Sequence, residues 1–201
     1  MADSRKGQVQ GRTRWKRFGV IMIPAVVAVG GIVFGMANGA IAASFSVSGQ
    51  SFKVSADKLE GTGFKQFGGI DKTNSGQQIP VATSTIGSAT LTNLCQSVKV
   101  PNLPVVLRIE AGGGSNPVTA KNLVIGAQLL QGDASFTNIQ IGRDAGELSG
   151  DPTLNGTFGQ SADSVTITGL KQVATSTSAG TFNLNGLNLR ILTGSAAQEC
   201  F

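Results

Sequence analysis

One four-residue pattern in this chain could carry nucleophilic chemistry. Ser55 and Lys58, in the stretch SADK, have the S-x-x-K spacing at which a lysine amine can deprotonate a serine hydroxyl. The S-D-N and K-T-G motifs that accompany S-x-x-K in penicillin-recognising enzymes are missing. We therefore predict a strand with an exposed Lys58, and retain an esterase or lipase that uses a Ser55–Lys58 pair as an alternative.

The residues of other common catalytic sets are missing from the sequence. The chain contains no histidine, so neither a Ser-His-Asp nor a Cys-His set can be assembled from it. The G-x-S-x-G motif of a nucleophile elbow is also missing. The composition favours a non-catalytic protein and indicates no cofactor.

A short oxygen-rich stretch resembles the start of a calcium loop. Asp151, Thr153 and Asn155 alternate, with glycine at the sixth place, but the twelfth place is Ala162 where a bidentate glutamate is needed. A surface turn that contains proline is the favoured interpretation, and Asp151, Thr153 and Asn155 are only a weak calcium candidate. Two cysteines without histidine are too few ligands for zinc.

The two cysteines, Cys95 and Cys200, are the only ones in the chain. An even pair in an oxidising compartment favours a disulfide, which would fasten the C-terminal tail to the core. Two free buried thiols are the alternative.

The N-terminal segment is an export signal or an anchor. Residues 1–17 hold six of the sixteen Lys and Arg residues, and residues 18–37 are uncharged and apolar, long enough to cross a hydrocarbon layer of about 30 Å. The alternative is a secretory signal peptide, with A-x-A at residues 40–42 and cleavage between Ala42 and Ala43. We predict a cytoplasmic n-region (1–17), a transmembrane helix or signal peptide (18–42) and one β-rich extracytoplasmic domain (43–201).

The net positive charge is confined to the leader. From residue 43 onward the chain has ten basic and ten acidic residues, so the exported part is formally neutral despite the net charge of +5 for the whole chain. This distribution removes the main support for nucleic-acid binding. It predicts a location at the cell membrane with the C-terminal domain outside, or secretion after cleavage.

A recurring pattern predicts bent strands. Apolar residues step by two, as in a strand, but step by three across an Asn or Gly, a residue type that accepts the left-handed conformation of a corner or bulge. We predict an all-β domain, as a sandwich or an open, curved jelly-roll-like sheet, with a short β-solenoid as the alternative. The predicted corners are Gly49, Gly61, Asn93, Asn122, Asn138, Gly156, Gly169 and Gly186.

Several segments together resemble a known family. GRTRWKRF, AIAASFSVSGQSFKVSADKLEGTGF, NLCQSVKVPNLP, ADSVTITGLKQVATSTSAGTF and the terminal ECF are similar to an uncharacterised family of exported, membrane-associated proteins of filamentous actinobacteria. The resemblance implies an envelope protein, and relatives often carry an automatic cholesterol esterase label. FKVSADKLEG also resembles strands of bitopic lipid-transport proteins that join one membrane helix to a curved β jelly roll.

These observations favour a non-catalytic envelope protein that acts by binding. A lipid or another apolar ligand, or another envelope protein, is the expected partner, besides the membrane itself through the N-terminal helix. A structural or assembly subunit of the envelope is a second alternative to this binding protein, beside the esterase.

Overall fold

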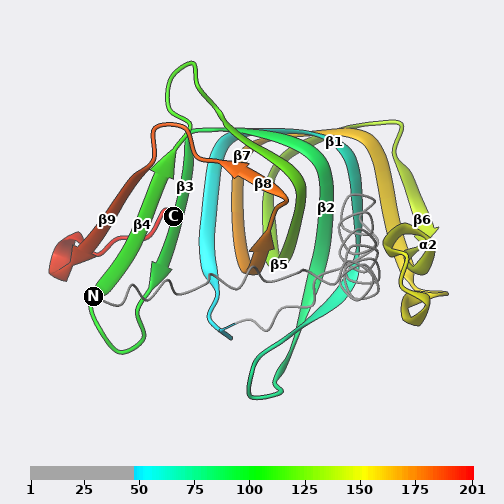
Figure 1. Ribbon diagram of the computed structural model, residues 1–201, viewed down its shortest axis with the longest axis horizontal. Coiled ribbons are helices and arrows are strands. Elements are labelled where there is room, and N and C mark those ends of the chain that lie inside the picture. Colours follow the sequence, from blue (N-terminus) through cyan, green and yellow to red (C-terminus); the bar gives the residue numbers. More distant parts are fainter. Residues whose placement is uncertain (1–47) are drawn as a thin grey trace, which may run out of the picture. The chain divides into compact units, whose positions relative to one another are not determined.

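The computed structural model describes residues 48–201, most of which are in β-strands (Figure 1). The all-β prediction is therefore confirmed, whereas the predicted N-terminal helix and the Ala42–Ala43 cleavage site lie outside the described residues. None of the helices in the described part is long and apolar enough to span a membrane. The elements are β1 (Phe52–Lys72), β2 (Gln78–Thr92), β3 (Leu94–Lys99), β4 (Val105–Ala111), β5 (Val118–Thr137), β6 (Gln140–Asp144), α2 (Ala145–Ser149), η1 (Pro152–Leu154), β7 (Phe158–Ser178), β8 (Thr181–Asn183), β9 (Asn188–Thr193) and η2 (Gly194–Ala196).

All nine strands belong to one antiparallel sheet. Its order is β6-β7-β5-β2-β1-β3-β4-β9, and β8 pairs with β5. Strand β7 also pairs with β1, so β1, β2, β5 and β7 form a closed ring of pairings. Of the predicted architectures the curved sheet describes this arrangement, because the strands do not divide into the two packed sheets of a sandwich.

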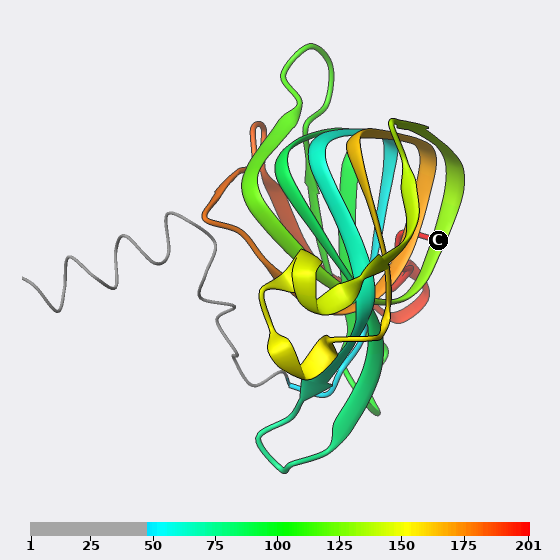
Figure 2. The ribbon, with the colours of Figure 1, turned by 90° about the vertical axis from the view of Figure 1, so that its right-hand side faces the viewer.

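The longest strands bend around the core. Strands β1 and β7 have 21 residues each and β5 has 20, whereas five or six residues is usual. Figures 1 and 2 show these strands arching. In β1 the buried positions include Ala56 and then Leu59, a step of three that returns apolar side chains to the core after the bend.

Corner positions follow the Asn and Gly pattern. Seven of the eight predicted corners have a positive φ, namely Gly49, Asn93, Asn122, Asn138, Gly156, Gly169 and Gly186. Gly61 is the exception, and that prediction is wrong because the bend lies at Gly63, with φ 67°. Gly61 instead faces the core, where a Cβ atom would lie 2.6 Å from Cγ2 of Ile86.

The corners form two rows across the sheet. In one row the Asn93 side-chain amide donates a hydrogen bond to the Asp57 carboxylate over 2.5 Å, and in the other Asn138 donates to Asp163 over 2.7 Å. We call the part of the sheet between the two rows the central face. It consists of residues 58–62 of β1, 88–92 of β2, 118–121 of β5 and 164–168 of β7.

The main core lies inside the curl. Its apolar side chains come from the ring strands and include Leu59, Val118 and Leu170, each almost wholly buried. The rings of Phe64 and Phe136 lie 5.4 Å apart between centroids. Burial of these side chains is the main contribution that stabilises the sheet.

Asp144 caps the short helix α2 and gives the stability a pH dependence. Its carboxylate accepts hydrogen bonds from the amides of Gly156 (2.6 Å), Gly146 (2.8 Å) and Glu147 (3.3 Å), and these bonds hold the pKa of Asp144 below its usual value of about 4. Because the pKa of Asp144 is lower in the folded protein than in the unfolded chain, the ionised carboxylate stabilises the fold at pH values above the unfolded pKa. This stabilisation is lost as pH falls through the folded pKa.

We expect Asp144→Asn to lower the melting temperature at pH 7 and to have little effect at pH 2. A difference that stays constant over this range, in thermal melts followed by circular dichroism, would contradict the assignment.

A disulfide holds the C-terminal tail on the sheet. Cys95 of β3 is bonded to Cys200, with an Sγ–Sγ distance of 2.00 Å. The Cys200 amide donates to the hydroxyl of the fully buried Ser97, and the Lys53 amine forms an ion pair with Glu199 over 3.1 Å. The same amine lies 5.2 Å from the ring centroid of Phe201. The tail therefore covers the outer side of β1 and β3.

Candidate functional site

Part of the sheet extends beyond the closed ring. It consists of β3, β4 and β9, which lie side by side in Figure 1, and we call it the wing. Antiparallel partners point to the same side of a sheet, so the register assigns each residue a side. Val54, which faces the core, pairs with Gln96, and this row continues through Ile109 to Leu189.

The inner side of the wing is apolar and open. Val98, Leu107 and Ile191 form a second row beside the first. The exposed fractions of Leu189 and Ile191 are 55% and 67%. This side continues the core side of the sheet, where apolar residues normally lie beneath a second layer. The wing thus presents a core-like surface to its surroundings.

The outer side of the wing carries a cluster of ion pairs around Glu110. Arg108 forms an ion pair with Glu110 over 2.8 Å, and Arg190 also contacts Glu110. Burial raises the pKa of Glu110, but the two guanidinium groups lower it by more, so the pKa lies below its usual value. The carboxylate therefore stays ionised and ties β4 to β9, which supports the wing from behind.

A narrow slit joins the wing to the core. It has a volume of about 30 Å³, and its lining includes Gln96, Leu123 and Phe182. Space of this size holds about one water molecule. An apolar ligand would therefore lie along the wing at the mouth of the slit, because the described core has no room for it.

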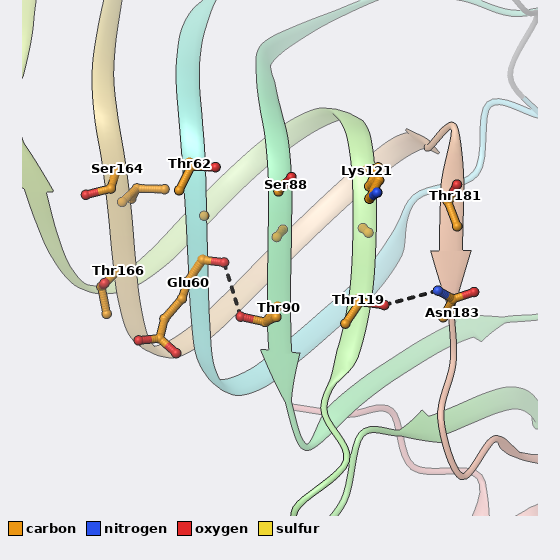
Figure 3. A pocket seen from close by; sticks show the side chains of 14 residues that line it. Glu60, Thr62, Ser88, Thr90, Thr119, Lys121, Ser164, Thr166, Thr181 and Asn183 are labelled. Atoms are coloured by element: carbon orange, nitrogen blue, oxygen red, sulfur yellow. Dashed lines mark hydrogen bonds between the residues drawn. The ribbon is translucent and has the colours of Figure 1, made fainter. Parts of the chain in front are cut away.

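The larger hollow lies on the central face, on the side away from the core (Figure 3). Its volume is about 530 Å³, and it crosses β8, β5, β2, β1 and β7. Two rows of polar side chains line it, because alternate residues of each strand share a side. The first row is Asn183, Thr119, Thr90, Glu60 and Thr166, and the second is Thr181, Lys121, Ser88, Thr62 and Ser164.

Serine and threonine supply seven of the ten polar side chains that line this hollow. The Asn183 amide donates to the Thr119 hydroxyl over 3.2 Å, as the dashed line in Figure 3 shows. Glu60 forms an ion pair with Lys58 over 2.7 Å, so its charge is neutralised locally. Serine and threonine hydroxyls both donate and accept hydrogen bonds. The arrangement suits an uncharged ligand that is rich in hydroxyl groups.

The proposed nucleophile pair is not assembled by hydrogen bonds in the described residues. Ser55 lies before the corner of β1 between Ala56 and Leu59, and it pairs with Cys95 and Lys171. Lys58 lies after that corner, where its amine binds Glu60 and its side chain is exposed as the sequence predicted. The Lys58 amine is therefore engaged by the carboxylate of Glu60 in place of the Ser55 hydroxyl.

The weak calcium candidate forms a turn. The Asp151 carboxylate accepts hydrogen bonds from the amide and the hydroxyl of Thr153, which lower the pKa of Asp151, and it caps the short η1 helix. Asn155 follows this helix, and its backbone N–H donates a hydrogen bond to the backbone carbonyl of Pro152. Within residues 48–201 no cluster of three acidic, cysteine or histidine side chains is placed to hold a metal ion.

Sequence reasoning missed both surfaces. The hollow had a signal in the alternation of hydroxyl residues, such as Ser88 with Thr90 and Ser164 with Thr166. The wing had none, because the sequence of β9 alternates like any strand with one buried side. Only the pairing of β9 at the end of the sheet shows that no other element of residues 48–201 covers its apolar side.

Comparison with known proteins gives one result. The model of the family of unknown function DUF6230 matches residues 48–201. No curated protein and no solved structure matches the chain.

Proposed function

The chain belongs to the DUF6230 family of unknown function, and we propose that it is a non-catalytic envelope protein that binds the acyl chains of a lipid on its wing. The open apolar inner side of β3, β4 and β9 carries this proposal. Leu107, Ile109, Leu189 and Ile191 form a continuous surface there without a charged side chain. Contact with acyl chains removes this surface from water, which is favourable in proportion to the area buried.

The length of chain before the sheet favours a lipid over a soluble partner. If residues 18–37 cross the membrane, ten residues separate this span from Ser48, where the described part begins. Ten extended residues reach at most about 35 Å. An anchored protein therefore keeps Ser48 within this reach of the membrane surface, where lipids are the most abundant apolar partner.

Lipid retention by the full chain tests this proposal. We expect Leu189→Ser combined with Ile191→Ser to weaken binding of a fluorescent fatty acyl probe about thirtyfold, since each side chain contributes on the order of 1 kcal/mol. Ile141→Ser is the matched control, because Ile141 of β6 is 68% exposed but lies outside the wing. Equal losses of probe binding in the double variant and in Ile141→Ser would assign the binding to the leader or to non-specific hydrophobic contact, and would overturn the proposal.

The alternative functions predict other results. An assembly subunit would self-associate through the wing, and the double serine variant would then sediment as a smaller species without any change in lipid retention. An esterase would lose hydrolysis of a p-nitrophenyl acyl ester on Ser55→Ala. We expect both the wild type and this variant to hydrolyse the ester at the rate of buffer alone.

A further inference from the structure

The wing and the hydroxyl-lined hollow meet at one strand. Phe182 of β8 lines the slit at the mouth of the wing, whereas its neighbours Thr181 and Asn183 line the hollow. Within residues 48–201, β8 pairs with β5 alone, opposite residues 119–121. Its other edge is unpaired in this part of the chain. A ligand that passes around this edge can contact both surfaces.

From this juxtaposition we propose that the ligand is a glycolipid, with its acyl chains on the wing and its sugar head group in the hollow. The inference rests on the proposed function, because the wing supplies the acyl site. It adds the class of head group, which the wing alone does not select. Strand β8 separates the two halves of the ligand, with Phe182 toward the acyl chains and Thr181 toward the sugars.

The size of the hollow fits more than one sugar ring. It crosses five neighbouring strands, and four spacings of about 4.8 Å give a length of about 19 Å. The two polar rows lie two residues apart along each strand, which is about 6.7 Å. The floor between the rows is the backbone at Gly61, Ala89 and Ala120, which face the core on the other side of the sheet.

The charge of the lining favours a sugar over a phosphate head group. Among the described residues, Lys121 is the only cation that lines the hollow, and Glu60 lies in the same lining with Lys58 as its ion-pair partner. A phosphate site would be expected to gather several cations or backbone amides around one point. Here, eight of the ten polar side chains are Ser, Thr or Asn, spread over five strands. Such a lining hydrogen-bonds many hydroxyl groups at separate positions.

Photo-crosslinking locates the two halves of the ligand. The full chain is placed in phosphatidylcholine vesicles with a diacylglycerol that carries a disaccharide head group, and a diazirine is attached either to the acyl end or to the sugar. We expect the acyl probe to label peptides of β4 and β9 and the sugar probe to label residues 119–121 and 181–183. Labelling of the wing by the acyl probe with no labelling of the hollow by the sugar probe would overturn the glycolipid proposal alone. Failure of both probes to label would overturn the acyl site as well.

Substitution in the hollow tests the selection of the head group. We expect Thr90→Val combined with Thr119→Val to reduce labelling by the sugar probe about thirtyfold, from the loss of two hydrogen bonds of about 1 kcal/mol each. Acyl labelling of the wing should persist. Thr85→Val is the matched control, since Thr85 is a half-buried threonine of the same strand outside the hollow. An excess of phosphatidylglycerol with the same acyl chains should displace the sugar probe poorly, and equal displacement by phosphatidylglycerol and by unlabelled glycolipid would refute selection of sugar.

Discussion

Loss of the Cys95–Cys200 disulfide is expected to reduce the free energy of unfolding by up to about 4.7 kcal/mol, the value for a closed loop of about 100 residues. The two cysteines are 105 residues apart, so the bond removes much of the freedom of the unfolded chain. The tail keeps its contacts of Lys53 with Glu199 and of Cys200 with Ser97 after reduction. The measured loss should therefore fall below this ceiling. Urea unfolding with and without a reducing agent measures it.

A serine variant separates the disulfide from other effects of the reducing agent. Cys95→Ser combined with Cys200→Ser should unfold at the same urea concentration in either condition, close to the midpoint of the reduced wild type. An oxidised wild type that is no more stable than this double variant would show that the bond does not constrain the unfolded chain. Labelling of thiols in the native protein would then support the two free thiols that the sequence left open.

Local chemistry made part of this fold predictable. Asn93, Asn122 and Gly169 were identifiable as corners because few residue types accept a positive φ, and this preference acts on one residue at a time. The all-β character followed from alternating apolar residues in the same way. Where two glycines lie close together, as Gly61 and Gly63 do, this preference alone does not determine which of them adopts a positive φ. The choice was made by the core, which has no room for a side chain at Gly61.

The closed ring and the two surfaces depend on partners far apart in the chain. Phe52 pairs with Ala174, and no pattern within either strand specifies that partner. The hollow needs hydroxyl residues from five strands to align in register, and a shift of one residue in any strand would turn them toward the core. The apolar side of β9 is ordinary in sequence, and its exposure follows from its position at the end of the sheet.

Gly112 is the second position where we expect a large effect. It follows β4 with φ 74°, and an added Cβ atom would lie 2.8 Å from the Leu91 carbonyl oxygen and 2.9 Å from the Val118 amide nitrogen. Both neighbours are backbone atoms of paired strands, so they cannot rotate away. We expect Gly112→Ala to cost about 2–5 kcal/mol, from roughly 1–2 for the left-handed backbone and 1–3 for overpacking. Chemical denaturation measures this loss.

Gly114 provides the matched control. Its φ of 67° is similar, but an added Cβ atom would meet no atom within 4 Å. Gly114→Ala should therefore show only the backbone cost of about 1–2 kcal/mol. Equal losses at the two positions would mean that the strands around Gly112 adjust freely and that the close approach is unimportant.

The same substitution links stability to binding. The Gly112 amide donates to the Asn185 carbonyl over 2.7 Å, and the Gly112 carbonyl accepts from the Asn93 amide over 2.9 Å. Asn185 lies in the segment between β8 and β9. Gly112 therefore connects the row of corners that contains Asn93 to the segment that lies between the hollow and the wing. Gly112→Ala should displace this segment and weaken binding of the fatty acyl probe even where the protein remains folded. Gly114→Ala should leave probe binding unchanged, and a loss of binding that only follows the folded fraction in both variants would contradict this role for Gly112.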